Sequence, residues 1–202
     1  MMKQKHVLYV LFVTVVLAVF AFPVAAQSTA AKPLPESYVS EDENLTLRYP
    51  SGWVIQNDTP EATVIATDES LFDLGNEEIP SGEAALAVVF LDFGGELSET
   101  LVLGDDPLSI LNSLVTGVFK TGDETTDAEL GTPETITFAD HPAARVDGTI
   151  TGNAVFLIIV DQGDKNYLLY VGVTSADEMP KFEPKLLAIA ESVHHVPSAI
   201  SP

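Results

Sequence analysis

Residues 154–174 contain two apolar runs that flank one short polar segment. The runs include residues 156–160 and 167–171, and the polar sequence between them is DQGDKN. Two apolar runs joined by a short loop rich in Asp, Gly and Asn predict an antiparallel β-hairpin. Because neither run alternates apolar with polar residues, both faces of each strand must be covered. We therefore expect this hairpin to lie in the middle of a layered domain.

Shorter patterns on both sides of the hairpin predict further strands and two loops. Residues 45–49 alternate apolar and polar side chains, and the Pro-Ser-Gly sequence that follows predicts a turn into a second strand, which gives a first hairpin. Another hairpin is expected around Asp140-His141-Pro142. We predict strands at residues 45–49, 53–56, 63–67, 84–93, 134–138 and 143–151. The segments 68–82 and 121–133 are acidic and rich in turn residues, so we predict loops there.

Two segments show the spacing of amphipathic helices. Asp106 and Pro107 provide an N-cap and a first helical residue, and Gly122 is expected to end this helix. Its apolar stripe consists of Leu108, Leu111, Val115, Val118 and Phe119. A C-terminal helix is indicated by Phe182, Leu186, Ile189 and Val193. Because Pro184 would remove an internal hydrogen bond, we expect the regular part of that helix to begin near Phe182.

The N-terminal residues are typical of a secretory signal. Lys3 and Lys5 precede an apolar run, and small residues at 24–26 offer a cleavage site before Gln27. An uncleaved anchor is the alternative, but the run is shorter than the ~20 residues that a spanning helix needs. We expect an exported protein, extracellular or periplasmic, with no stable membrane span after cleavage. The predicted organisation is a signal peptide at 1–26, a flexible linker at 27–37, a domain at 38–196 and a tail at 197–202.

The charge of the chain restricts its partners. The formal net charge is −21, and removal of the signal with its two lysines makes it −23. Such a field repels phosphates and anionic lipid head groups, so we exclude nucleic acid and disfavour electrostatic membrane binding. A cationic protein surface, a polyamine or a metal ion remains compatible with it. The chain has no cysteine, which excludes disulfides, thiolate zinc sites and cysteine nucleophiles.

No catalytic motif is present. The chain lacks a Gly-x-Ser-x-Gly elbow, a His-Glu-x-x-His sequence, a phosphate loop and a dinucleotide glycine pattern. His194 and His195 are adjacent and would chelate poorly as a pair, so we interpret them as exposed residues at a helix end, and His141 as a turn residue. Catalysis by paired carboxylates requires one of them to be buried, whereas these cluster in loops. We expect no catalytic residue and no cofactor, calcium excepted.

Two sets of polar residues are candidates for binding. Asp161, Asp164 and Asn166 offer hard oxygen ligands for calcium, but Asp, Gly and Asn are also what a plain hairpin turn requires, and we prefer the turn. The acidic loops are candidate contact surfaces for a protein partner, because loops carry function more often than cores do. Their candidate residues are Asp68, Glu69, Asp73, Glu77, Glu78, Asp123, Glu124 and Asp127.

The remaining aromatic and basic residues have structural interpretations. Tyr49 and Trp53 flank a turn, and we expect them on a sheet face buried under a helix rather than on a binding platform. Arg48 and Arg145 each lie in a predicted strand, so one of them is expected to pair with a carboxylate at the edge of the core.

Several stretches together resemble the PsbP-like superfamily. They are LTLRYPSGW at 45–53, PSGEAAL at 80–86, ADHPAAR at 139–145, the central hairpin, and the IAESV end of the last helix. The superfamily includes the photosystem II extrinsic protein PsbP, a Ran-binding nuclear import factor and exported bacterial proteins of unassigned role. The resemblance implies an α+β protein, an α/β/α sandwich with a central antiparallel sheet flanked by helices. It also implies a binding or assembly factor without catalysis.

Three functional hypotheses follow. The leading one is an exported, non-enzymatic domain that binds another protein or stabilises an envelope assembly. The second is a calcium-responsive acidic module of the cell envelope. The third is a hydrolase with an unrecognised carboxylate pair, which would need a cleft holding two carboxyl groups with separated pKa values.

Overall fold

The fold is that of a computed structural model, which describes residues 34–41, 44–59, 62–72, 77–92, 104–119 and 127–195. The predicted signal peptide and tail therefore lie outside the described residues, as do most of the linker and the candidates Asp73, Asp123 and Glu124. The first strand begins at Glu36, inside the segment predicted as linker.

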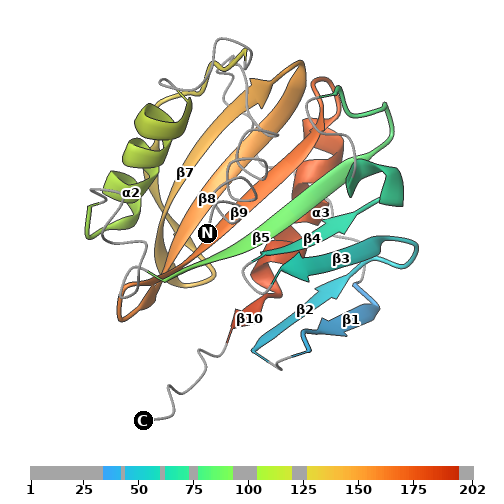
Figure 1. The fold of residues 1–202 in the computed structure, drawn as a ribbon, viewed down its shortest axis with the longest axis horizontal. Coiled ribbons are helices and arrows are strands. Elements are labelled where there is room, and N and C mark those ends of the chain that lie inside the picture. Colours follow the sequence, from blue (N-terminus) through green and yellow to red (C-terminus); the bar gives the residue numbers. More distant parts are fainter. Residues whose placement is uncertain are drawn as a thin grey trace, which may run out of the picture.

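A seven-stranded antiparallel sheet forms the centre of the domain (Figure 1). Its order is β3-β4-β5-β9-β8-β7-β6, so the strands of the predicted central hairpin, β8 and β9, lie away from both edges. The bounds are β3 Val54–Thr59, β4 Ala62–Ala66, β5 Ala84–Asp92, β6 Glu134–Phe138, β7 His141–Ile150, β8 Asn153–Gly163 and β9 Asn166–Ser175. With two helices of ordinary α type, this confirms the predicted α+β class.

A second, three-stranded sheet corrects the predicted first hairpin. It has the order β1-β2-β10, with β1 Glu36–Val39, β2 Leu45–Tyr49 and β10 His194–His195. β2 therefore pairs with β1 and β10, whereas β3 pairs with β4 in the large sheet. Gly52, with φ of 83°, redirects the chain between them. The prediction that 45–49 and 53–56 pair was wrong because both sides of β2 are already taken, one by the preceding strand β1 and the other by β10 near the end of the domain.

Helix α2, Pro107–Leu114, begins as predicted. The Asp106 carboxylate accepts a hydrogen bond from the Ser109 backbone N–H at 3.0 Å, and a π-helical turn, η3 Val115–Phe119, continues the helix. The buried residues of α2 and η3 include Leu111 and Val115, which were predicted, and also Ile110 and Leu114. The predicted end at Gly122 lies outside the described residues.

Helix α3, Met179–Glu191, begins earlier than predicted. The Glu178 carbonyl accepts the first helical hydrogen bond from the Phe182 N–H at 3.1 Å. Pro180 lies in the first turn, where no N–H is needed, and Pro184 inside the helix removes only one bond. The predicted start at Phe182 was therefore wrong. The helix tolerates one missing backbone hydrogen bond near its start because its apolar face, with Phe182, Leu186 and Ile189, is buried.

The two helices pack against opposite faces of the large sheet. In β8, Val155, Leu157 and Ile159 belong to the core cluster of α2, while the alternate residues Phe156, Ile158 and Val160 belong to the cluster of α3. In Figure 1, α2 lies beside β7 and α3 lies behind β9 and β5. These six side chains of β8 are at most 2% exposed, and each contributes about 1.5–3 kcal/mol of hydrophobic stabilisation.

Two tight turns set the register of the hairpins. Asp164 and Lys165 join β8 to β9, and Ala139 and Asp140 join β6 to β7, and all four have positive φ between 48° and 67°. Paired positive φ values mark turns whose twist matches that of the flanking strands. The β6–β7 turn therefore precedes the predicted position, since His141 and Pro142 already belong to β7.

Candidate functional site

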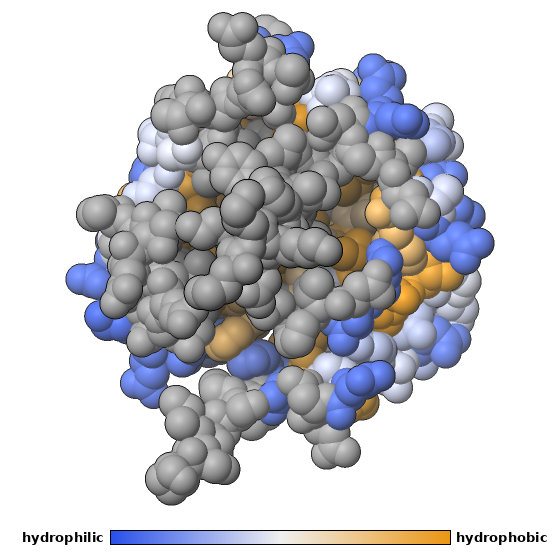
Figure 2. All heavy atoms as spheres, viewed as in Figure 1, coloured by the Kyte–Doolittle hydropathy of each residue, from blue (hydrophilic) through white to orange (hydrophobic). Residues whose placement is uncertain are grey.

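The topology brings the described parts of both acidic loops to one end of the large sheet. β4, β7 and β9 finish at this end and β5 and β8 begin there, as the pairs Ala66 with Ala85, Ala84 with Thr174, and Ala154 with Thr174 require. We call it the acidic end. Its carboxylates are those of Asp68, Glu69, Glu77, Glu78, Glu83, Asp127, Glu129, Asp177 and Glu178, most of them exposed. In Figure 2 hydrophilic residues lie around the rim of the molecule, among them those at the top and upper right, where this end lies.

A buried asparagine anchors the first loop to the sheet. Asn153, 3% exposed at the start of β8, accepts a hydrogen bond from the Ile79 N–H at 2.7 Å and donates one to the Glu77 carbonyl at 3.2 Å. Both the carbonyl oxygen and the NH2 group of this side chain are therefore used to hold residues 77–79. Asn153 was missed by the sequence analysis, in which it was only the residue before an apolar run.

The turn between β7 and β8 lies between the two loops. The Glu78 side chain packs over Gly152, where a Cβ atom would lie 2.8 Å from a Glu78 carboxylate oxygen. On the other side, the Asp127 carbonyl accepts a hydrogen bond from the Thr151 N–H at 3.4 Å. Glu77, Glu78 and Asp127 are thus brought together around one turn, although 49 residues separate Glu78 from Asp127 in the sequence.

Glu178 joins the end of the first loop to helix α3. Its carboxylate accepts hydrogen bonds from the Gly82 N–H, from the Ser175 hydroxyl at 3.1 Å and from the Lys181 ammonium at 2.5 Å. The Lys181 bond and the Gly82 bond lower the pKa of Glu178 to about 2, because they stabilise the ionised form. A further hydrogen bond holds the end of this loop, because the Thr174 hydroxyl donates to the Glu83 carbonyl at 2.9 Å.

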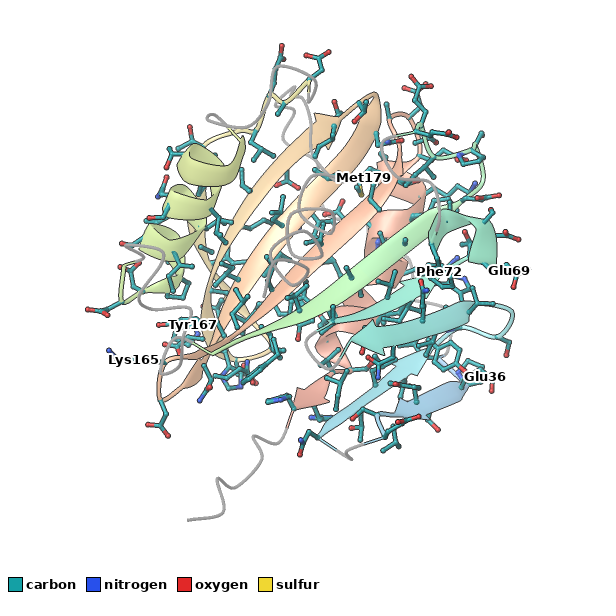
Figure 3. The ribbon with its side chains drawn as sticks, in the orientation of Figure 1. Glu36, Glu69, Phe72, Lys165, Tyr167 and Met179 are labelled. Carbon is teal, nitrogen blue, oxygen red and sulfur yellow. The ribbon has the colours of Figure 1, made fainter. Side chains whose placement is uncertain are left out.

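Asp68 and Glu69 begin a short 3-10 helix, η1 Glu69–Phe72, within the segment predicted as a loop. Asp68 accepts a hydrogen bond from the Ser70 N–H at 2.9 Å, which lowers the pKa of Asp68. Phe72 packs against the core cluster of α2. Glu69 is exposed and lies farther from the sheet than Phe72 (Figure 3). Asp68 thus has a local capping role, and Glu69 faces solvent.

The calcium candidates lie at the opposite end of the sheet, beside Lys165 and Tyr167 (Figure 3). Asp161 accepts a hydrogen bond from the Gly163 N–H at 2.7 Å, and the Asn166 amide donates to the Asp164 carbonyl at 3.3 Å. These are bonds of a turn with a β-bulge, in agreement with the preferred interpretation. Within the described ranges, no three His, Cys, Asp or Glu side chains form a group that could hold a metal ion.

The three histidines of the described residues do not form one site. His194 is exposed in β10 and His141 is exposed in β7, but His195 is partly buried, and its ring stacks on Phe90 with the centroids 4.1 Å apart. The interpretation of His195 as an exposed helix-end residue was therefore wrong, because the chain adds a strand to β2 after α3 ends.

The expectations for the basic and aromatic residues agree with the structure. Arg145 pairs with Asp147 and Glu183, each at 2.5 Å, and lies 5.2 Å from the centroid of the Phe156 ring. Tyr49 and Trp53 are partly buried against the core cluster of α3. These contacts are structural.

Comparison with known proteins shows the fold only. No protein-family model matches the chain, and neither does any curated protein. Among solved structures, the chain is similar to the cyanobacterial PsbP, CyanoP, from Synechocystis sp. PCC 6803. The TM-score is 0.52 at 11% identity, over 87% of this chain and 100% of that one. This confirms the resemblance to the PsbP-like superfamily at the level of the fold.

Two further structures extend the comparison. A protein from Bacteroides thetaiotaomicron VPI-5482 aligns with a TM-score of 0.50 and 10% identity over 82% of this chain and 50% of that one, so the chain spans about half of its length. The Saccharomyces cerevisiae Ran-binding protein Mog1p aligns less well, with a TM-score of 0.46 and 9% identity over 80% and 95% of the two chains. In the part of this chain that the structure describes, neither helix is long and apolar enough to cross a membrane.

Proposed function

We propose that this chain is an exported, non-enzymatic domain that binds another protein, or stabilises an envelope assembly, through the acidic end of its sheet. The observation that carries the proposal is the convergence of Glu77, Glu78 and Asp127 around the Thr151–Gly152 turn, with the first loop anchored by buried Asn153. A loop held by a rigid sheet presents its side chains in a fixed geometry, which lowers the entropy cost of binding.

The partner that this surface fits is a protein with a cationic face. Exposed carboxylates from the loops before β5 and β6 and from the segment after β9 give this end of the molecule a strongly negative potential. Electrostatic complementarity of this kind steers association and is weakened by salt. Salt sensitivity of the complex is therefore an expected property.

The absence of catalysis is part of the proposal. A carboxylate that acts as a general acid needs a raised pKa, which burial provides. At the acidic end, hydrogen bonds lower the pKa of both Asp68 and Glu178, which is the opposite of what a general acid requires. We also propose the full α/β/α sandwich layout, which is supported by the packing of α2 and α3 on opposite faces.

Capture of partners from an envelope extract of the source cells, with tagged residues 27–202, tests this proposal. The test variant is Glu77→Gln/Glu78→Gln/Asp127→Asn, and the matched control is Asp140→Asn/Asp161→Asn/Asp164→Asn, which removes the same charge at the opposite end. We expect a near-stoichiometric partner that the wild type and the control retain and the test variant loses, with weaker capture at moderate salt. Equal retention by the two variants would place the contact elsewhere.

Calcium binding by the exposed carboxylates of the acidic loops is the alternative proposal, although no three of them form a group that could hold a metal ion within the described residues. Thermal unfolding with calcium, compared at equal ionic strength with magnesium and sodium, separates it from general screening. A rise in the melting temperature with calcium alone supports a calcium site, whereas equal rises with all three salts indicate screening.

A further inference from the structure

The two edges of the large sheet differ in how they are protected. β3, at one edge, has a register shift between Gln56 and Thr59, and such bulges discourage pairing with another strand. β6, at the other edge, pairs with β7 residue by residue over its full length without a shift. Its sequence, ETITF, contains no lysine or proline, which are common protective residues on edge strands. In the described part of the chain, β7 is the only strand paired with β6.

The free backbone groups of β6 can be assigned from its register. Thr137 lies opposite Pro142, which has no N–H, so this pair cannot exchange two backbone hydrogen bonds. Hydrogen-bonded and non-hydrogen-bonded pairs alternate in an antiparallel ladder, so Thr135 opposite Ala144 is also non-hydrogen-bonded. The N–H and C=O groups of Thr135 and Thr137 therefore point away from β7, and both residues are exposed.

These groups are complementary to a second copy of the same strand. If two β6 strands run antiparallel about a two-fold axis at Ile136, Thr135 of one copy lies opposite Thr137 of the other. Both threonines offer an N–H and a C=O, so the two pairs form four backbone hydrogen bonds. Glu134 then lies opposite Phe138, which avoids apposed like charges, and threonine pairs across strands are favourable. We propose that the chain forms a symmetric dimer in which β6 pairs with β6 of a second copy.

The charge distribution fits this arrangement. β7 runs toward the acidic end, and β6 is antiparallel to it, so β6 begins near the acidic end and finishes at the opposite one. An antiparallel β6 pair therefore directs the two acidic ends away from each other. With a net charge of −23 on each mature chain, the remaining repulsion is long-ranged and screened by salt. The dimer is therefore more stable in moderate salt, in contrast with the cationic partner complex, which salt weakens.

Sedimentation velocity of residues 27–202 over a range of concentrations in moderate salt tests the dimer. Thr135→Pro removes an N–H that points away from β7, so the β6–β7 ladder is unaffected, yet each dimer loses two hydrogen bonds. We expect Thr135→Pro to raise the dissociation constant on the order of tenfold or more. The matched variant Thr135→Val keeps the backbone N–H and should dimerise like the wild type. A monomeric wild type, or a dimer that Thr135→Pro leaves unchanged while its circular dichroism stays native, would overturn the proposal.

Cysteine cross-linking is a second test of the dimer, and it does not depend on a proline substitution. The chain has no cysteine, so Ile136→Cys introduces one thiol per chain. At the two-fold axis the paired Cβ atoms lie about 4.5–5.5 Å apart, close to disulfide geometry, whereas Thr135→Cys places them on a diagonal of about 7–8 Å. We expect Ile136→Cys to form covalent dimers at least about tenfold faster than Thr135→Cys under mild oxidation. Equal rates would exclude this register.

Discussion

Replacement of Asn153 by alanine should release the first acidic loop from the sheet. Asn153 is 3% exposed, and its amide makes one hydrogen bond to the Ile79 N–H at 2.7 Å and one to the Glu77 carbonyl at 3.2 Å. Alanine removes both partners at once. Ile79 is itself buried, so in the variant its N–H has lost its acceptor and is shielded from water.

The size of the effect can be worked out from these two bonds. A buried donor left without a partner costs about 1–3 kcal/mol, and loss of the second bond adds about 0.5–1.5 kcal/mol. Water that enters the space of the side chain would recover part of this energy, so we expect a loss of about 2–3 kcal/mol in the free energy of unfolding. For a domain of this size, that corresponds to a fall of about 4–12 °C in melting temperature.

Two measurements check this prediction. Urea unfolding gives the change in free energy, and amide hydrogen exchange of residues 77–82 reports whether the loop has been released. Asn166→Ala is the matched control, because its amide makes a single turn bond at the opposite end of the sheet and should leave exchange at 77–82 unchanged. Unaltered stability and unaltered loop exchange in Asn153→Ala would refute the anchoring role.

Three further substitutions test other parts of the fold. Gly172→Ala places a Cβ 2.3 Å from the buried Phe156 ring, so we expect a loss of about 1–3 kcal/mol in urea unfolding from overpacking. Asp106→Ala removes the cap that Ser109 contacts and should cost about 1 kcal/mol, with a smaller loss for Asp106→Asn. The folded pKa of Glu178 is depressed to about 2 from 4.5, so its contribution is complete above pH 4.5 and is lost as the pH falls toward 2. Melting temperatures of Glu178→Gln should therefore fall less than those of the wild type over that pH range.

The sequence patterns that predicted the fold correctly are those whose physics is local. Consecutive apolar residues in β8 and β9 require cover on both faces, and the structure provides α2 on one face and α3 on the other. The N-cap at Asp106 depends on residues within one turn of the helix. The pairing of β2 depends instead on β10, about 150 residues away, and no periodicity within β2 carries that information.

In the candidate site, too, local features could be predicted from the sequence and long-range contacts could not. Composition identified the acidic loops, but their meeting at one end follows from the order of strands, which the alternation of side chains does not determine. Asn153 could have been noticed as a polar residue between a Thr-Gly turn and a fully apolar strand, where burial demands partners. Its partners, Glu77 and Ile79, lie more than 70 residues earlier, so the sequence offered no means of naming them.

The two proposals have a joint consequence for binding. A dimer through β6 holds two acidic ends that face in opposite directions on one continuous sheet, so a single cationic site on a small partner cannot engage both. An assembly with repeated cationic sites can engage them together, and the second contact then forms at a high effective concentration. Because salt weakens each acidic contact but strengthens the β6 pairing, capture of such an assembly should be strongest at an intermediate salt concentration, whereas capture of a partner with a single cationic site should only decline with salt. Thr135→Pro should remove this maximum and leave a steady decline with salt, since only the acidic contacts then remain.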